Sequence, residues 1–148
     1  MSENYQRTIN EQINFKGIGL HNGQNVNLSI KPAEENFGIK FRRIDIDENN
    51  LIEANYQNVV EPILCTKIRN KQGATVSTVE HLMAAFFGEG IDNALVEIDS
   101  PEVPILDGSA VEFVEEIRKV GIKSQKEQRK FIKVMNKVEV KDGEKYIS

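Results

Sequence analysis

The chain has 148 residues and a formal net charge of −4, and 39% of its residues are hydrophobic and 28% charged. This composition is typical of an ordinary globular protein of one domain, or of one domain and the beginning of another. The mild charge excludes general polyanion binding, and the single cysteine, Cys65, excludes an internal disulfide and a cysteine-rich zinc cage.

The N-terminal stretch, M-S-E-N-Y-Q-R-T-I-N, contains no apolar signal region, and no run approaches the roughly 18 apolar residues of a membrane span. The sequence also lacks a basic stripe interleaved with aromatic residues, which nucleic-acid binding would require. We therefore expect a cytoplasmic protein with no membrane span and no nucleic-acid partner.

The first part of the chain reads as consecutive strands. Alternating apolar and polar residues predict strands at 13–20, 25–30, 39–44, 51–60 and 63–70. Between the first two strands, Asn22-Gly23 predicts a tight hairpin turn, because both residues tolerate positive φ.

The best-marked helix lies in the stretch Ser77 to Asn93, where Gly88 and Gly90 end it and Asp92-Asn93 turns the chain into the next strand. Ser77 and Glu80 have the spacing of a capping box, which places the start of the helix. One face carries the apolar residues expected to lie on a core, namely Val79, Leu82, Met83, Phe86 and Phe87. The opposite face carries small residues and one imidazole, namely His81, Ala84, Ala85 and Gly88. We expect this small-residue face to be covered or to form the wall of a cleft.

A buried strand and a second helix follow. Residues 94–98 predict the strand, and an extended segment, S-P-E-V-P-I-L, comes after it. The second helix begins at another capping box, Ser109 and Glu112, and ends at Gly121. Its apolar stripe consists of Ala110, Phe113, Val114, Ile117 and Val120.

The order of elements is typical of an α+β fold, because strands come first and two amphipathic helices then flank one more strand. We predict a two-layer sandwich in which an antiparallel-rich sheet of about five strands carries two helices on one face. The N-terminal α+β domain is expected at 1–122 and a polar linker at 123–130. The first strands of a truncated second domain are expected at 131–148, where 131–140 reads as a strand and Asp142-Gly143 as a hairpin turn.

The leading candidate site is the pair Glu80-His81. Histidine is the commonest metal ligand, and a carboxylate beside it can act as general base toward a metal-bound water. The alternative is structural, since a glutamate in the first turn is usually a cap and a lone histidine usually satisfies a local hydrogen bond. A catalytic zinc needs three protein ligands, and the only other histidine, His21, is equally a residue that tolerates a turn. On this basis Cys65 reads as a small buried hydrophobe and Asp107 as a turn residue.

Six motifs occur in order from near Thr8 onward: G-I-G-L-H-N-G, K-P-A-E-E-N-F-G-I-K-F-R-R-I-D, I-L-C-T, S-T-V-E-H-L-M-A-A, G-I-D-N and P-E-V-P-I-L-D-G-S-A. Together they resemble the UDP-3-O-acyl-N-acetylglucosamine deacetylase family, the zinc enzymes of lipid A biosynthesis. The resemblance implies two domains of similar topology, with their helices sandwiched between two sheets. It also implies that this chain is one half of such a β-α-α-β enzyme, and that the small-residue helix face meets the helices of the partner domain.

By the same resemblance, Glu80 is the catalytic general base and His81 is a zinc ligand. The positions near the substrate cleft are Leu20, His21, Leu64, Cys65, Thr66 and Asp107. The implied reaction is hydrolysis of the N-acetyl group of UDP-3-O-acyl-N-acetylglucosamine, with zinc as the cofactor.

The family's remaining zinc ligands lie in an H-K-x-x-D motif of the second domain, as does a histidine that assists the oxyanion, and this sequence has no counterpart of them. We therefore expect the chain to be inactive alone and to need the second domain or a complementary chain as its partner. Two other interpretations stay open. One is a non-catalytic binding module that pairs through the small-residue helix face, and the other is a different metallohydrolase that takes its missing ligands from a homodimer.

Overall fold

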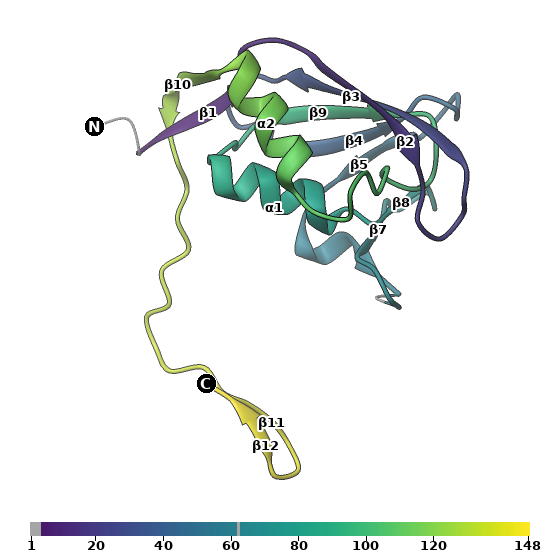
Figure 1. Cartoon of the computed structure of the whole chain (residues 1–148). Coiled ribbons are helices and arrows are strands. Elements are labelled where there is room, and N and C mark those ends of the chain that lie inside the picture. The colour runs from purple at the N-terminus through teal and green to yellow at the C-terminus, as the bar shows by residue number, and fades with distance from the viewer. Residues whose placement is uncertain (1–3, 62) are drawn as a thin grey trace.

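The computed structural model describes residues 4–61 and 63–148 (Figure 1). The described residues contain the α-helices α1 (Glu80–Glu89) and α2 (Val111–Val120) and a 3₁₀ helix, η1 (Tyr56–Asn58). The strands are β1 (Tyr5–Ile9), β2 (Ile13–Ile18), β3 (Asn25–Pro32), β4 (Ile39–Arg43), β5 (Leu51–Glu53), β6 (Val59–Val60), β7 (Lys67–Arg69), β8 (Thr75–Ser77), β9 (Ala94–Ile98), β10 (Ile122–Gln128), β11 (Val140–Asp142) and β12 (Lys145–Ile147).

The main layer is a five-stranded sheet with the order β2-β3-β9-β4-β5. Its neighbouring strands run antiparallel except for β4 and β9, which are parallel. Both helices lie on one face of this sheet (Figure 1). The predicted α+β class, with an antiparallel-rich sheet and two helices on one side, is confirmed.

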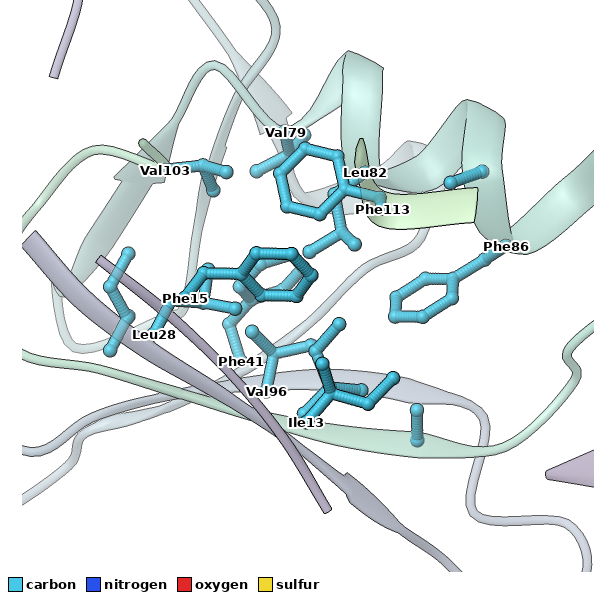
Figure 2. Close-up of a cluster of buried hydrophobic side chains, with 14 of the residues drawn as sticks. Ile13, Phe15, Leu28, Phe41, Val79, Leu82, Phe86, Val96, Val103 and Phe113 are labelled. Atoms are coloured by element: carbon cyan, nitrogen blue, oxygen red, sulfur yellow. The ribbon is translucent and has the colours of Figure 1, made fainter. Parts of the chain in front are cut away.

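The core fills the space between the sheet and the helices (Figure 2). Alternate residues of the strands point inward, as a half-buried sheet requires, and those of β3 are Val26, Leu28 and Ile30. Phe15 of β2 meets Phe113 of α2 edge to face, with ring centroids 4.9 Å apart. This pair ties α2 to the edge of the sheet.

The apolar stripe of α1 is confirmed only in part. Val79, Leu82 and Phe86 are buried, whereas Phe87 is 89% exposed and the prediction for it is wrong. Ala85, predicted on the opposite face, is fully buried. At about 100° per residue, Phe87 lies about 140° from Leu82 and faces away from the core, whereas Ala85 lies only about 60° from it.

Helix α2 follows its prediction more closely. Its stripe packs on the core, with Phe113 and Ile117 fully buried, and Gly121 ends it with a positive φ of 82°. The predicted capping box is wrong in its second half. Ser109 Oγ accepts a backbone N–H of the first turn at 3.1 Å, but the Glu112 side chain takes no part in capping this helix.

A single strand was predicted at each of the stretches 51–60 and 63–70, and both predictions are wrong. The first divides into β5, η1 and β6, and only β7 forms within the second. Asn55 accounts for the break, because its side chain accepts the Asn58 N–H at 3.1 Å and so caps η1. Strands β6, β7 and β8 then form a separate three-stranded sheet that leads the chain into α1.

The polar stretch at 123–130, predicted to be a linker, forms most of β10. This strand pairs antiparallel with β1, with Ile122 opposite Ile9. The Gln125 side chain accepts a hydrogen bond from Asn93 at 2.8 Å. A polar residue of this stretch therefore bonds to the rest of the fold. The division of the chain into domains stays a prediction.

Residues 131–139 contain no strand, although one was predicted there. Their side chains are exposed, and Ile132 is 95% exposed, so no sheet or core gives an extended conformation a packing partner. The hairpin that follows is confirmed, with Asp142 opposite Lys145 in β11 and β12. Figure 1 shows this hairpin apart from the main sheet.

None of the helices in the described residues is long and apolar enough to cross a membrane.

Candidate functional site

Helix α1 begins without the predicted capping box. Ser77 ends β8, and its hydroxyl donates to the Pro101 carbonyl oxygen at 3.2 Å. Val79, which precedes the helix, already has helical backbone angles and makes no side-chain cap. The turn is made by Thr78, whose φ is 57°. Because a β-branched residue is strained at this φ, its surroundings must hold Thr78 in place.

Glu80 is the first residue of α1, and its half-buried side chain reaches a neighbouring loop. Its Oε2 atom accepts the backbone N–H of Thr66 at 3.0 Å. Within the described residues, 4–61 and 63–148, Glu80 Oε1 takes part in no hydrogen bond. One oxygen is thus oriented by the backbone while the other remains available, which suits a general base.

His81 follows Glu80 and is half-buried. The N–H and hydroxyl of Ser109, both 2.9 Å from Asp107 Oδ1, lower the pKa of Asp107, and the charge of His81 lowers it further. The exposed Asp107 carboxylate is therefore ionised within electrostatic reach of the His81 imidazole.

His21 lies in the loop between β2 and β3. The hairpin is confirmed, but the tight turn at Asn22-Gly23 is wrong, because the Gly19 N–H donates to the Gln24 carbonyl at 3.0 Å and closes a longer loop. Of the predicted pair only Gly23 has a positive φ, 64°. The backbone N–H groups of His21 and Asn22 donate instead to an acceptor outside this loop.

That acceptor is Glu102, a carboxylate which the sequence analysis did not single out. Its side chain is 2% exposed and accepts the N–H of His21 at 3.0 Å, the N–H of Asn22 at 2.9 Å and the hydroxyl of Thr78 at 2.8 Å. Burial raises the pKa of Glu102, but these donors lower it more, so the pKa lies below its ordinary value. A signal was present in the sequence, since Glu102 is the one charge in the segment P-E-V-P-I-L.

A cavity of about 350 Å³ brings His21 and Cys65 together, and Glu102 also lines it. Thr66 instead lines a pocket of about 200 Å³, together with Val79 and Met83 on the α1 side. Leu20 and Leu64 line neither space and are 58% and 88% exposed. The structure therefore brings His21 and Cys65 together but places Thr66 in a second pocket and the other predicted cleft residues in neither.

Zinc is implied by the resemblance, and the residues of this chain fit it only in part. Within 4–61 and 63–148, no group of three or more His, Cys, Asp or Glu side chains could hold a metal ion. The half-buried imidazole of His81 suits one ligand position, whereas a catalytic zinc needs three. What this chain offers is one ligand nitrogen beside one oriented carboxylate.

Comparisons with known proteins find a matching family and similar proteins. A family model described as UDP-3-O-acyl N-acetylglycosamine deacetylase matches residues 6–148. Three curated relatives share the name UDP-3-O-acyl-N-acetylglucosamine deacetylase. The protein of Geotalea uraniireducens (strain Rf4) is 50% identical over 144 residues, which are 97% of this chain and 47% of the relative.

The relative from Geobacter sp. (strain M21) is 49% identical over 141 residues, which are 95% of this chain and 46% of that protein. The relative from Shewanella halifaxensis (strain HAW-EB4) is 46% identical over 142 residues, which are 96% of this chain and 46% of that protein. The chain thus spans about half the length of the curated relatives it matches.

Proposed function

The chain belongs to the UDP-3-O-acyl N-acetylglycosamine deacetylase family, and from this membership we propose that it supplies one half of a zinc-dependent deacetylase site. The proposed substrate is UDP-3-O-acyl-N-acetylglucosamine, after which the relatives are named. The proposed reaction is hydrolysis of its N-acetyl group in lipid A biosynthesis. A second domain or a complementary chain supplies the other half, so the 148 residues alone hydrolyse nothing.

The observation that carries this proposal is the arrangement of Glu80 and His81 at the start of α1. Glu80 Oε2 is held by the Thr66 N–H at 3.0 Å, which orients the carboxylate and leaves Oε1 to receive a proton. His81 offers an imidazole nitrogen as a ligand from the adjacent position. A bound zinc ion lowers the pKa of a coordinated water, so that a nearby base can deprotonate it at neutral pH.

The remaining predicted residues are proposed to line the substrate cleft. Leu20 and Leu64 are exposed apolar side chains, a feature that suits contact with a ligand or a partner surface. His21 and Cys65 share the cavity of about 350 Å³. Asp107 places a negative charge near His81.

The test is a chimera in which residues 6–148 replace the matching segment of the Geotalea uraniireducens relative. We expect it to release acetate from UDP-3-O-acyl-N-acetylglucosamine in the presence of zinc. Glu80→Gln should lower kcat by about 100-fold or more, because it removes the base without changing the shape of the side chain. The matched control is Glu53→Gln, which alters an exposed glutamate of β5 paired with Lys40 at 3.0 Å and should leave kcat unchanged. A Glu80→Gln chimera as active as its parent, or acetate release by the 148 residues alone, would contradict the proposal.

A second candidate function rests on the exposed surface of α1. Phe87 is 89% exposed and lies near Ala84 and Gly88, which are also exposed, so a partner can approach the helix closely. The alternative proposal is a non-catalytic module that pairs with itself or another protein through this surface. Sedimentation of the chain at micromolar concentrations tests self-pairing. Association that Phe87→Ala abolishes would support it, and a monomer throughout would count against it.

A further inference from the structure

The extended segment from Pro101 to Ile105 joins two separate parts of the candidate site. On one side, the Ser77 N–H donates to the Pro101 carbonyl at 2.9 Å and the Val103 N–H donates to the Ser77 carbonyl at 3.0 Å. On the other side, the Ile105 N–H donates to the Ile18 carbonyl at the end of β2 at 3.0 Å. The segment therefore lies between the residue that leads into α1 and the strand that leads into the His21 loop.

The two carboxylate oxygens of Glu102 make a second connection between the start of α1 and the His21 loop. Oε1 accepts the His21 N–H at 3.0 Å and the Thr78 hydroxyl at 2.8 Å. Oε2 accepts the Asn22 N–H at 2.9 Å and shares the His21 N–H at 3.2 Å. Glu102 is 2% exposed, so these bonds form in largely buried surroundings. Charge-assisted bonds in such surroundings are among the stronger hydrogen bonds in proteins.

Each end of this connection controls a candidate site residue. Thr78, at a φ of 57°, sets the direction in which α1 leaves β8, and Glu80 and His81 follow it by two and three positions. At the other end, the bond to the His21 N–H fixes the backbone that carries the second histidine. We propose that Glu102 is a positioning residue that holds His21 and the Glu80-His81 pair in a fixed relation. Its meaning for catalysis rests on the proposed function, whereas the positioning is a property of this chain.

Both terminal atoms of a carboxylate are acceptors, so Glu102 satisfies all three donors at this place. A glutamine has the same shape, but one of its two terminal atoms is an NH₂ group that donates. Whichever way Glu102→Gln is turned, the NH₂ group faces a backbone N–H, so either the Asn22 bond of 2.9 Å or the shorter His21 bond of 3.0 Å is lost. Gly19 shows how closely the loop packs here, because a Cβ on Gly19 would lie 2.6 Å from Glu102 Oε2.

The test uses NMR spectra of the 148-residue chain, whose two histidines give two sets of imidazole signals. We expect Glu102→Gln to shift the signals of both His21 and His81 and to speed the exchange of the amide proton of His21 or of Asn22 by about tenfold. The matched control is Glu97→Gln, which changes a partly buried glutamate of β9 paired with Lys31 at 2.6 Å and should move neither histidine. A folded Glu102→Gln chain with the parent His81 signals would overturn the proposal, even if the His21 signals moved.

A second variant decides the matter if Glu102→Gln does not fold. Gly19→Ala keeps the carboxylate but places a methyl group too close to both Asn22 Oδ1 and Glu102 Oε2, so we expect the signals of both histidines to move again. Movement of the His21 signals alone would overturn the proposal. These spectra need neither zinc nor substrate. Unmoved His81 signals would therefore refute the positioning role of Glu102 and leave the deacetylase proposal unaffected. Undiminished activity of the Glu80→Gln chimera would refute the deacetylase proposal and leave the positioning role unaffected.

Discussion

Two adjacent phenylalanines of α1 test how this helix is rotated against the core. Phe86 is 1% exposed and Phe87 is 89% exposed, so the same substitution at the two positions separates burial from every other effect. Phe86→Ala removes a ring packed between the helix and the sheet and should lower the free energy of unfolding by about 3–5 kcal/mol. Phe87→Ala should change it by no more than about 0.5 kcal/mol, because an exposed ring leaves no cavity. The gain in helix propensity is equal for both and cancels in the comparison.

Urea unfolding followed by far-ultraviolet circular dichroism suits this chain, which has no tryptophan. A loss of 3–5 kcal/mol corresponds to a fall in Tm of about 10 °C for Phe86→Ala, while Phe87→Ala stays within about 2 °C of the parent. Measurement at two protein concentrations shows whether the exposed surface associates. Equal losses for the two variants at low concentration would refute the rotation of α1, and with it the placing of His81 away from the core.

Three further substitutions test contacts elsewhere in the fold. Gly90→Ala should lower the free energy of unfolding by at least about 1–2 kcal/mol in thermal unfolding, since Gly90 has a φ of 66° and its Cβ would collide with the Arg7 guanidinium. Asn93→Ala removes three hydrogen bonds of 2.8–2.9 Å from a side chain that is 1% exposed, and should cost about 2–4 kcal/mol in urea unfolding. The Arg43 guanidinium lowers the pKa of Asp45, so this carboxylate stabilises the fold above its ordinary pKa of about 3.9 and loses that effect as the pH falls through the lowered value. Asp45→Asn should therefore be less stable than the parent at pH 7, with the difference shrinking below about pH 4; a constant difference would contradict this.

The strands and helices that the sequence predicts well are those in which local pattern and packing agree. In β3 and β9 the alternation of apolar and polar residues matches one buried face, and in α2 the apolar stripe lies wholly on the core. The pattern fails where a residue bonds to a distant part of the chain. Ser77 matches a capping box, but it pairs with Lys67 at the end of β8, and its N–H group and hydroxyl both donate to the Pro101 carbonyl.

The candidate site shows the same limit. Glu80 and His81 stand out in the sequence because they are adjacent on a marked helix, and the structure adds the Thr66 N–H that orients the carboxylate. Glu102 could be noticed as a lone charge in an apolar segment, but its donors come from residues about 80 and 24 positions away. Such long-range hydrogen bonds leave no periodic trace in a sequence.

Metal analysis of the purified chimera tests the central proposal most directly, namely that His81 is a ligand in a zinc site which this chain cannot complete. We expect one zinc per molecule in the parent chimera and in its His21→Ala variant, and none in its His81→Ala variant or in the 148-residue chain alone. Zinc retained in full by a folded His81→Ala chimera, or bound stoichiometrically by the isolated chain, would contradict the account.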